Sequence, residues 1–331
     1  MIENISLAIE RRHALLFTLQ EEGTTCYRLF HGATEGIPGL SIDRYGPILL
    51  FQTWRSPIQK NRIEEIAGII CQKLKVDLCT VWNHRQKRGQ VEHHPFGEIS
   101  AEVMGHELGI QYNVNPIHAG IDPLLFLDFR AARRWIKKQA QNKTILNLFS
   151  YTCGIGTAAC AGHAQSVTNV DFSARALDIG KKNAQQNGFS SKQFQSIHDD
   201  VFPVIRQFSG LGVKGRAARR KFVRRAPCTF DIVVLDPPRM AKSPFGKVDL
   251  VHDYPSLFKP ALLCVQPGGW ILATNNVASV PEAQWHDQLQ RCAQKVGLSF
   301  QRFSALRPEE DFPSPDKRWP LKMVVCQLAS S

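Results

Sequence analysis

The chain has 331 residues, enough for about two domains that each bury a core of their own. Its hydrophobic content of 43% and charged content of 21% are ordinary for a globular protein. No apolar stretch approaches the ~20 residues that span a bilayer, so we expect no membrane partner. The net charge of +12 favours a polyanionic partner.

The first residues and the cysteines indicate the cellular compartment. The opening sequence MIENISLAIERRHALLF carries charges inside its only apolar run, so we expect that it does not act as a signal peptide. The nine cysteines are scattered, without a CxxC pair or a metal-like cluster. This usage is typical of reduced, buried thiols and favours a cytoplasmic location.

The N-terminal part predicts a mixed α+β domain over residues 1–110. Its first ~20 residues have helical periodicity. The sequence GLSIDRYGPILLFQTW predicts a strand hairpin that turns at Tyr45-Gly46-Pro47. Further predicted elements are a helix at 58–74, strands at 78–82, 99–104 and 108–113, and a polar loop at 84–98.

The remaining residues, 111–331, alternate strands with helices. This rhythm predicts a Rossmann-like α/β domain with a mostly parallel, doubly wound sheet. The predicted strands are 144–148, 167–171, 194–197, 230–235, 270–274, 299–305 and 322–327, seven in all. The predicted helices are 126–138, 157–164, 174–187, 201–208, 255–265 and 282–296.

Positive charge is concentrated in the sequence LGVKGRAARRKFVRR, residues 211–225, which we call the basic segment. It has no acidic residue and no apolar periodicity, so it predicts either a solvated loop or a segment that grips phosphates. The residues that would bind RNA are Lys214, Arg216, Arg219, Arg220, Lys221, Arg224 and Arg225.

A glycine turn follows the strand predicted at 144–148, in the sequence NLFSYTCGIGTAACAG. Gly154 and Gly156 allow the backbone to turn sharply and to approach a ligand closely. Asp171, at the end of the next strand, has the place of an acid that accepts hydrogen bonds from ribose hydroxyls. This pattern fits NAD as well as S-adenosylmethionine.

Three further features favour S-adenosylmethionine. The turn continues with Thr157 and lacks a third glycine for a pyrophosphate. Asp200, after the third strand, is placed to bind the adenine amino group. The fourth strand ends in DIVVLDPPR, and two prolines directly after a central strand cannot continue its hydrogen-bond ladder. They predict a rigid turn beside the cofactor, and the combination indicates a methyltransferase.

Several of these motifs together resemble those of a known family. The sequences NLFSYTCGIG, VDFSARALDIGKKNAQQNG, DDVF, FDIVVLDPPR and LFLDFR are similar to those of bacterial large-subunit rRNA methyltransferases of the RlmI and RlmK kind. The resemblance runs from about residue 27 to the end. We expect the N-terminal PUA domain usual in that family to be absent, so that RNA binding falls to residues 1–110 and the basic segment.

The resemblance implies a set of cofactor-binding residues. Asp200 and the Val201 backbone would bind the adenine, and Asp171 the ribose. Asp128 and Arg130 match a segment that closes over the cofactor. The other residues of this set are Phe149, Tyr151, Gly154, Gly156, Phe172 and Asp236.

The acceptor atom depends on the residues after the fourth and fifth strands. Methylation of pyrimidine carbon 5 needs a cysteine thiolate, and in RlmI-like enzymes that cysteine follows the fifth strand. Here that position reads TNN, which resembles RlmK and favours a guanine ring nitrogen. The catalytic candidates are Asp236, Pro237, Arg239, Asn275 and Asn276. Alternatively, the two asparagines cap the following helix.

Other interpretations remain open at this stage. A pyrimidine carbon-5 methyltransferase could use an unexpected cysteine, and a ribosome-assembly factor could keep the fold without turnover. His93 and His94 form a pair without a third ligand, so we expect no metal. The sequence leaves the oligomeric state open, with a homodimer as one option.

Overall fold

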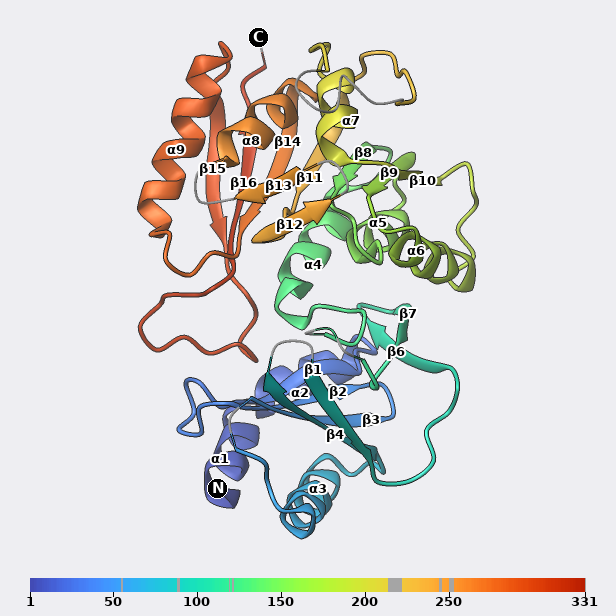
Figure 1. Cartoon of the computed structure of the whole chain (residues 1–331), viewed down its shortest axis with the longest axis vertical. Coiled ribbons are helices and arrows are strands. Elements are labelled where there is room, and N and C mark those ends of the chain that lie inside the picture. The colour runs from blue at the N-terminus through green and yellow to red at the C-terminus, as the bar shows by residue number, and fades with distance from the viewer. Residues whose placement is uncertain are drawn as a thin grey trace. The chain divides into compact units, whose positions relative to one another are not determined.

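The computed structural model describes residues 1–54, 56–87, 90–118, 120, 122–213, 222–243, 246–249 and 253–330. The chain forms two compact units (Figure 1). Unit 1 comprises Met1–Arg130 and Pro308–Arg318, and unit 2 comprises Ala131–Arg307 and Trp319–Ser331. We expected the division near residue 110. No helix in the described ranges is long and apolar enough to cross a membrane.

Unit 1 is built on a five-stranded sheet in the order β1-β2-β3-β4-β5. Its strands are β1 (Cys26–His31), β2 (Leu40–Tyr45), β3 (Ile48–Thr53), β4 (Cys79–Lys87) and β5 (Gln90–Pro95). The helices α1 (Ile2–Arg11), α2 (His13–Glu21) and α3 (Lys60–Leu74) bury apolar side chains against strand residues such as Leu49, Phe51 and Trp82. Tyr45 pairs with Ile48, which confirms the predicted hairpin.

Two predictions for unit 1 are wrong in detail. The polar stretch 84–98 is not a loop, because β4 and β5 pair there as an antiparallel hairpin. Polarity was misleading here, since the sheet buries the polar side chains of Asn83, His84 and Arg85. The strands predicted at 99–104 and 108–113 are β6 (Val103–Glu107) and β7 (Ile110–Val114), joined by a turn at Leu108, whose φ is 56°.

Unit 2 contains a seven-stranded sheet in the order β10-β9-β8-β11-β14-β16-β15. Its strands are β8 (Thr144–Leu148), β9 (Ser166–Asp171), β10 (Phe194–His198), β11 (Phe230–Leu235), β14 (Val265–Asn275), β15 (Phe300–Leu306) and β16 (Lys322–Leu328). The strands from β10 to β14 are parallel, whereas β16 runs antiparallel to β14 and β15. This confirms the predicted Rossmann-like α/β fold, and the strand order reverses between β8 and β11.

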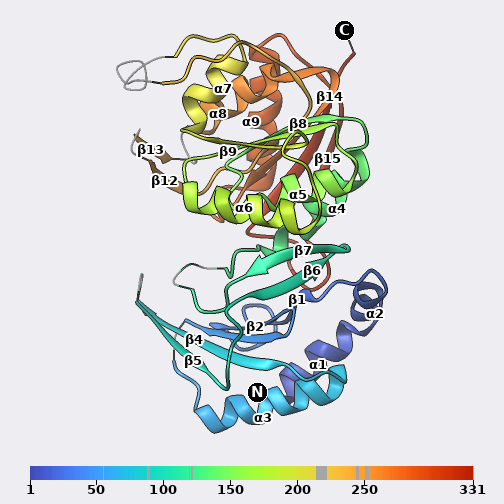
Figure 2. The same cartoon turned by 90° about the vertical axis from the view of Figure 1, so that its right-hand side faces the viewer.

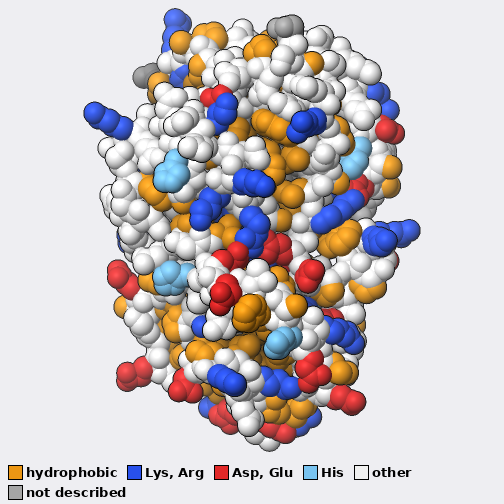
Figure 3. Space-filling model, turned by 180° about the vertical axis from the view of Figure 1, so that it is seen from behind, with side chains coloured by type: hydrophobic (Ala, Val, Ile, Leu, Met, Phe, Trp, Pro, Cys, Tyr) orange, Lys and Arg blue, Asp and Glu red, His pale blue; other side chains and the backbone are white. Residues whose placement is uncertain are grey.

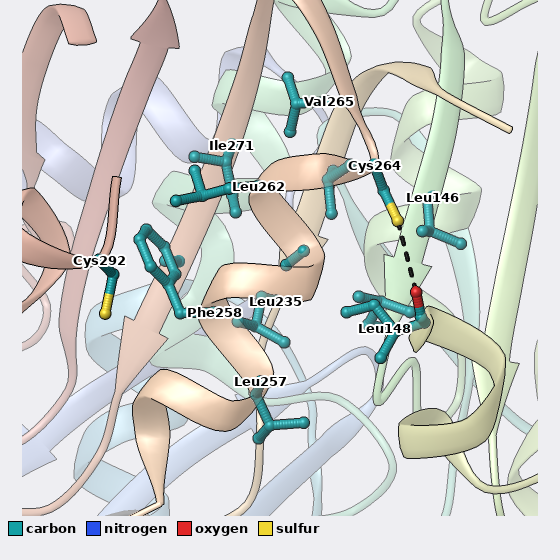
Figure 4. Close-up of a cluster of buried hydrophobic side chains, with 14 of the residues drawn as sticks. Leu146, Leu148, Leu235, Leu257, Phe258, Leu262, Cys264, Val265, Ile271 and Cys292 are labelled. Atoms are coloured by element: carbon teal, nitrogen blue, oxygen red, sulfur yellow. Dashed lines mark hydrogen bonds between the residues drawn. The ribbon is translucent and has the colours of Figure 1, made fainter. Parts of the chain in front are cut away.

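Helices cover both faces of this sheet (Figure 2). They are α4 (Arg130–Gln139), which follows the 3-10 turn η1 (Leu127–Phe129), α5 (Gly154–Ala161), α6 (Ala174–Gln186), α7 (Val201–Phe208), α8 (Tyr254–Leu263) and α9 (Glu282–Lys295). One core joins α7, α8 and α9 to sheet residues such as Leu148, Leu235 and Ile271 (Figure 4). A further hairpin, β12 (Met240–Ser243) with β13 (Gly246–Asp249), was not predicted.

Candidate active site at the carboxyl ends of the parallel strands

The parallel strands of unit 2 end together at one edge of the sheet. Leu148 pairs with Val170 and with Leu235, and Asp171 pairs with His198. The residues that follow these positions therefore lie at the same edge. In open α/β sheets this edge, near the reversal of strand order, is where ligands bind. Among the predicted site residues, Asp171 ends β9, Asp200 comes shortly after β10, and the Asp-Pro-Pro turn follows β11.

The turn after β8 has an unusual backbone. Phe149, Tyr151 and Cys153 have φ angles of 58°, 48° and 57°, a left-handed region that non-glycine residues rarely occupy. Such backbone concentrates at ligand sites. Cys153 ends the turn, and α5 begins at Gly154, three residues earlier than predicted. A Cβ at Gly156 would lie 2.2 Å from Asn169 Oδ1, so close packing of α5 on β9 requires this glycine.

Asp171 joins the glycine turn to the end of β9. Its carboxylate accepts hydrogen bonds from the backbone N–H groups of Tyr151 and Ser173, both at 2.8 Å. The side chain is buried, and burial raises the pKa of Asp171 above its usual value, while the two backbone N–H groups partly oppose this shift. The neighbouring Phe172 is half-buried, and its carbonyl oxygen lies 3.1 Å from His198 Nε2.

Two acids follow β10. Asp200 is the N-cap of α7 and accepts a hydrogen bond from the Phe202 N–H at 3.0 Å. Asp199 accepts the N–H of Asp200 at 2.8 Å and forms an ion pair with Arg225, whose Nη1 lies 3.0 Å from Asp199 Oδ2. Val201 is buried at the start of α7. Asp200 and Val201 were predicted from the sequence as adenine contacts, whereas Asp199 was not.

The Asp-Pro-Pro turn is held by side chains from other segments. The hydroxyl of Thr274 donates to Asp236 Oδ1, and the hydroxyl of Tyr254 donates to the Thr274 carbonyl oxygen at 2.8 Å. Burial, with the nearby charge of Asp236, keeps the pKa of Tyr254 well above its ordinary value, so this donor stays protonated. Pro237 is buried and Arg239 is exposed.

Asn275, the last residue of β14, and Asn276, which follows it, differ in environment. Asn275 is buried, and its Oδ1 accepts the N–H of Val277 at 2.9 Å. Lys322 Nζ donates to the Val277 carbonyl oxygen at 2.8 Å and so fixes the same turn. Asn276 is exposed. Asn275 thus stabilises a local turn, whereas the side chain of Asn276 is open to solvent.

Asp128 and Arg130 belong to unit 1. Asp128 is half-buried in η1. The Arg130 guanidinium is fully buried and donates to Glu309 at 2.7 Å, Asp311 at 2.6 Å and the Cys26 carbonyl oxygen at 3.0 Å. These bonds employ all three of its nitrogen atoms.

Of the basic segment, the structure describes residues 211–213 and 222–225. Lys214, Arg216, Arg219, Arg220 and Lys221 lie outside the described residues. Arg224 is exposed, whereas Arg225 is half-buried beside Asp199.

The histidine pair of unit 1 has partners of its own. His93 Nδ1 lies 2.7 Å from Asn83 Oδ1, and His94 stacks on Trp82 with 4.5 Å between ring centroids. Within the described ranges, no three His, Cys, Asp or Glu side chains are grouped as a metal site would require.

The residues that sequence reasoning missed are Asp199, Tyr254, Thr274 and Lys322. Asp199 bonds to the backbone of the next residue, whereas Tyr254, Thr274 and Lys322 bond to residues that are distant in the chain. The doubled acid of HDDVF was a usable signal for Asp199, whereas the sequence offered none for the other three.

The sheet order, the strained glycine turn and the row of acids define a class I S-adenosylmethionine-dependent methyltransferase fold. A family model for S-adenosylmethionine-dependent methyltransferases matches residues 28–326, and the chain belongs to this family.

Named relatives and a solved structure agree with this assignment. The chain is 29% identical to ribosomal RNA large subunit methyltransferase I of Aeromonas hydrophila over 323 residues, covering 94% of this chain and 75% of the relative. It is 27% identical to the protein of the same name from Shigella flexneri over 302 residues, covering 89% and 72%. A methyltransferase solved in complex with S-adenosylhomocysteine (SAH) is 25% identical, with a TM-score of 0.79 over 98% of this chain and 80% of that one.

Proposed function

We propose that this enzyme methylates a base of RNA, that the RNA is 23S rRNA, and that the acceptor is a guanine nitrogen. Its activity as an S-adenosylmethionine-dependent methyltransferase follows from the family. The observation that carries the RNA assignment is the similarity, over most of the chain, to enzymes named for the large ribosomal subunit. We place this chemistry in the cytoplasm, where ribosomes are made.

The residues at the sheet edge suit S-adenosylmethionine. The cofactor supplies an electrophilic methyl group on a positively charged sulfonium. Asp171 offers a buried carboxylate for the ribose, and Asp200 an acid for the adenine. The turn formed by Phe149, Tyr151 and Gly154 would face the methionine part. These acids give the pocket a negative potential that complements the charge of the cofactor.

The cysteines argue against a pyrimidine carbon-5 mechanism. Burial raises the pKa of Cys153 and Cys160 to about 12 and disfavours the thiolates of Cys264 and Cys326 as well. Figure 4 shows Cys264 and Cys292 among apolar side chains, with the Cys264 thiol on the Ile205 carbonyl oxygen. No cysteine lies between β14 and α9 in the sequence. The carbon-5 mechanism therefore has no candidate thiolate nucleophile in that segment.

A guanine ring nitrogen needs alignment rather than covalent activation. Its lone pair attacks the methyl carbon in line with the departing sulfur, so the enzyme mainly orients the base and excludes water. We assign base binding to Asp236, the Pro237 carbonyl and Asn276. Asn275 holds the turn that presents Asn276. Arg239, exposed after the two prolines, would contact a phosphate or stack on the base.

The target nucleotide must leave its stack to reach this edge, so the folded RNA has to be held nearby. We assign this task to the basic segment and to the N-terminal domain. The face in Figure 3 carries Lys and Arg side chains at many separate places, with acidic side chains among them. The basic side chains therefore do not form one uninterrupted surface on that face. We assign the phosphate contacts to the basic segment because positive charge is concentrated in its sequence.

The test is transfer of tritiated methyl from S-adenosylmethionine to rRNA taken from cells that lack this protein. Naked 23S rRNA, naked 16S rRNA and intact subunits are compared. We expect label in 23S rRNA, in a nucleoside that co-migrates with a methylguanosine. The Asp236→Asn variant should bind cofactor and transfer little label.

Other outcomes would identify the rival functions. Label in 5-methylcytidine, with a covalent complex on 5-fluoropyrimidine RNA, would contradict the guanine assignment and direct attention to the cysteines. Cofactor binding without transfer to any RNA would favour the ribosome-assembly role.

A further inference from the structure

Both described ends of the basic segment are tied to α7. At its start, Arg206 Nε donates to the Gly212 carbonyl oxygen at 2.8 Å, and the Leu211 N–H donates to the Arg206 carbonyl oxygen at 2.7 Å. At its end, the Arg225 N–H donates to Gln207 Oε1 at 2.9 Å. The segment thus leaves from α7 and returns to it, and α7 begins next to Asp200.

The side chain of Arg225 reaches the acid turn itself. Its Nη1 lies 3.0 Å from Asp199 Oδ2. The exposed fraction is 15% for the Arg225 side chain and 14% for the Asp199 side chain. The other carboxylate oxygen of Asp199 accepts the Asp200 N–H at 2.8 Å, and the Asp199 N–H donates to the Asp171 carbonyl oxygen at 3.1 Å. Asp199 is therefore the link between an arginine of the basic segment and the two cofactor acids.

The ion pair between Arg225 and Asp199 affects the charge and the orientation of the Asp199 carboxylate. Asp199 and Asp200 are consecutive acids after β10, and like charges on neighbouring residues repel. The Arg225 guanidinium offsets part of that repulsion and holds Asp199 in the orientation that accepts the Asp200 N–H. Without it, the Asp199 carboxylate is free to turn toward solvent, and Asp200 loses an acceptor that fixes its backbone.

We propose that Arg225 is a positioning residue for the adenine pocket and that it couples RNA binding at the basic segment to cofactor affinity. The coupling rests on the proposed function, because it requires RNA to contact the basic segment. By thermodynamic linkage, RNA would then strengthen cofactor binding by the same factor as the cofactor strengthens RNA binding. The positioning role needs no RNA.

The chain offers a matched control in Arg224, which neighbours Arg225 and is exposed. Arg225→Gln and Arg224→Gln each remove one positive charge from the basic segment, but only the first breaks the contact with Asp199. SAH affinity is measured by calorimetry without RNA. We expect Arg225→Gln to weaken SAH binding about two- to tenfold, in line with coupling energies between residues in contact. Arg224→Gln should leave it unchanged, and Arg225→Lys should restore part of the loss.

Two further readouts separate positioning from a general loss of structure. The preference for SAH over S-inosylhomocysteine, which lacks the adenine amino group, should fall in Arg225→Gln and persist in Arg224→Gln. In a double-mutant cycle, Asp199→Asn combined with Arg225→Gln should weaken SAH binding by less than the sum of the two single effects. Equal SAH affinities for Arg225→Gln and Arg224→Gln, or strict additivity in the cycle, would overturn the inference.

The coupling itself is tested by filter binding of labelled 23S rRNA with and without saturating SAH. SAH should tighten rRNA binding by the wild-type protein and do so less for Arg225→Gln. Equal tightening in both proteins would contradict the coupling. Failure of the proposed function would appear separately, as rRNA that is neither bound nor methylated while the SAH results without RNA still stand.

Discussion

Two groups of buried charges in this molecule are built in opposite ways. In unit 1, Arg130 is enclosed by Glu309 and Asp311, so that side chains of opposite charge neutralise one another. Burial alone would lower the pKa of Arg130, but these two carboxylates hold it above its ordinary value. At the sheet edge of unit 2, Asp171 is held by the backbone N–H groups of Tyr151 and Ser173, which carry no net charge.

The difference separates charges that stabilise the fold from charges kept for a ligand. The charge of a carboxylate paired with arginine is neutralised inside the protein. A carboxylate held by backbone N–H groups is fixed in place but remains negative, and so can bind ribose hydroxyls or an amino group. The sequence patterns around Arg130 and Asp171 both resembled cofactor-binding motifs, and only their partners distinguish them.

The largest effect should come from breaking the charge group of unit 1. Arg130→Met leaves Glu309 and Asp311 buried without their cation, which costs about 3–5 kcal/mol of unfolding free energy. Denaturant unfolding measures this loss. Lys138→Met, on the exposed face of the same helix, should change it by less than about 0.5 kcal/mol. A stable Arg130→Met protein with weakened cofactor binding would instead support the cofactor role that the sequence suggested.

The next effect concerns Asp171. Asn at this position removes the negative charge that would accept hydrogen bonds from the ribose hydroxyls. Losing a hydrogen bond to a charged group amounts to about 1.5–3 kcal/mol, so SAH affinity should fall about 10- to 150-fold. Calorimetry measures the affinity. Asp178→Asn, which removes an exposed carboxylate from α6, should have no effect. Unchanged affinity in Asp171→Asn would remove Asp171 from the cofactor site.

A smaller effect is expected at the acceptor side of the site. Thr274→Val deletes the hydroxyl that donates to Asp236 while keeping the shape of the side chain. We expect kcat for RNA methylation to fall about tenfold, because one charge-assisted hydrogen bond positions Asp236. SAH affinity should change less than about twofold. Thr274→Ser, which keeps the hydroxyl, is the control. Equal losses in both variants would point to packing rather than to the hydrogen bond.

The smallest effect is a shift with pH. Burial raises the pKa of Asp171 above its ordinary value of 3.8, so this carboxylate takes up a proton at a higher pH than an exposed aspartate does. Below that pH the protonated group no longer serves both backbone N–H groups, and SAH affinity should fall as the solution is acidified.

The contribution of Asp171 to folding has the opposite sign. Its folded-state pKa exceeds its unfolded one, so the folded chain binds the proton first and falling pH favours folding at this group. In the Asp171→Asn variant, the fall of SAH affinity caused by protonation of Asp171 should be absent. A midpoint at or below 3.8 in the wild-type protein would contradict the raised pKa.

The sequence alone determined much of unit 2. The alternation of buried strands and helices predicted the sheet, and the glycine turn, Asp171, Asp200 and Asp-Pro-Pro predicted its ligand edge. These features are local: each acid lies at the end of a strand or within two residues of it, and parallel strands must end at the same edge. A motif can be recognised from the sequence when its residues stand at the ends of parallel strands, because strand direction alone then places them at the same edge.

Tertiary structure decided the rest. The partners of Asp236 and Val277 lie 38 and 45 residues away, and Asp311 lies 181 residues from Arg130. The hairpin of β4 and β5 was hidden because its polar side chains are buried by neighbours that the local sequence does not contain. A side chain's role as scaffold or as ligand contact depends on the charges that fold against it, and those charges come from distant parts of the chain.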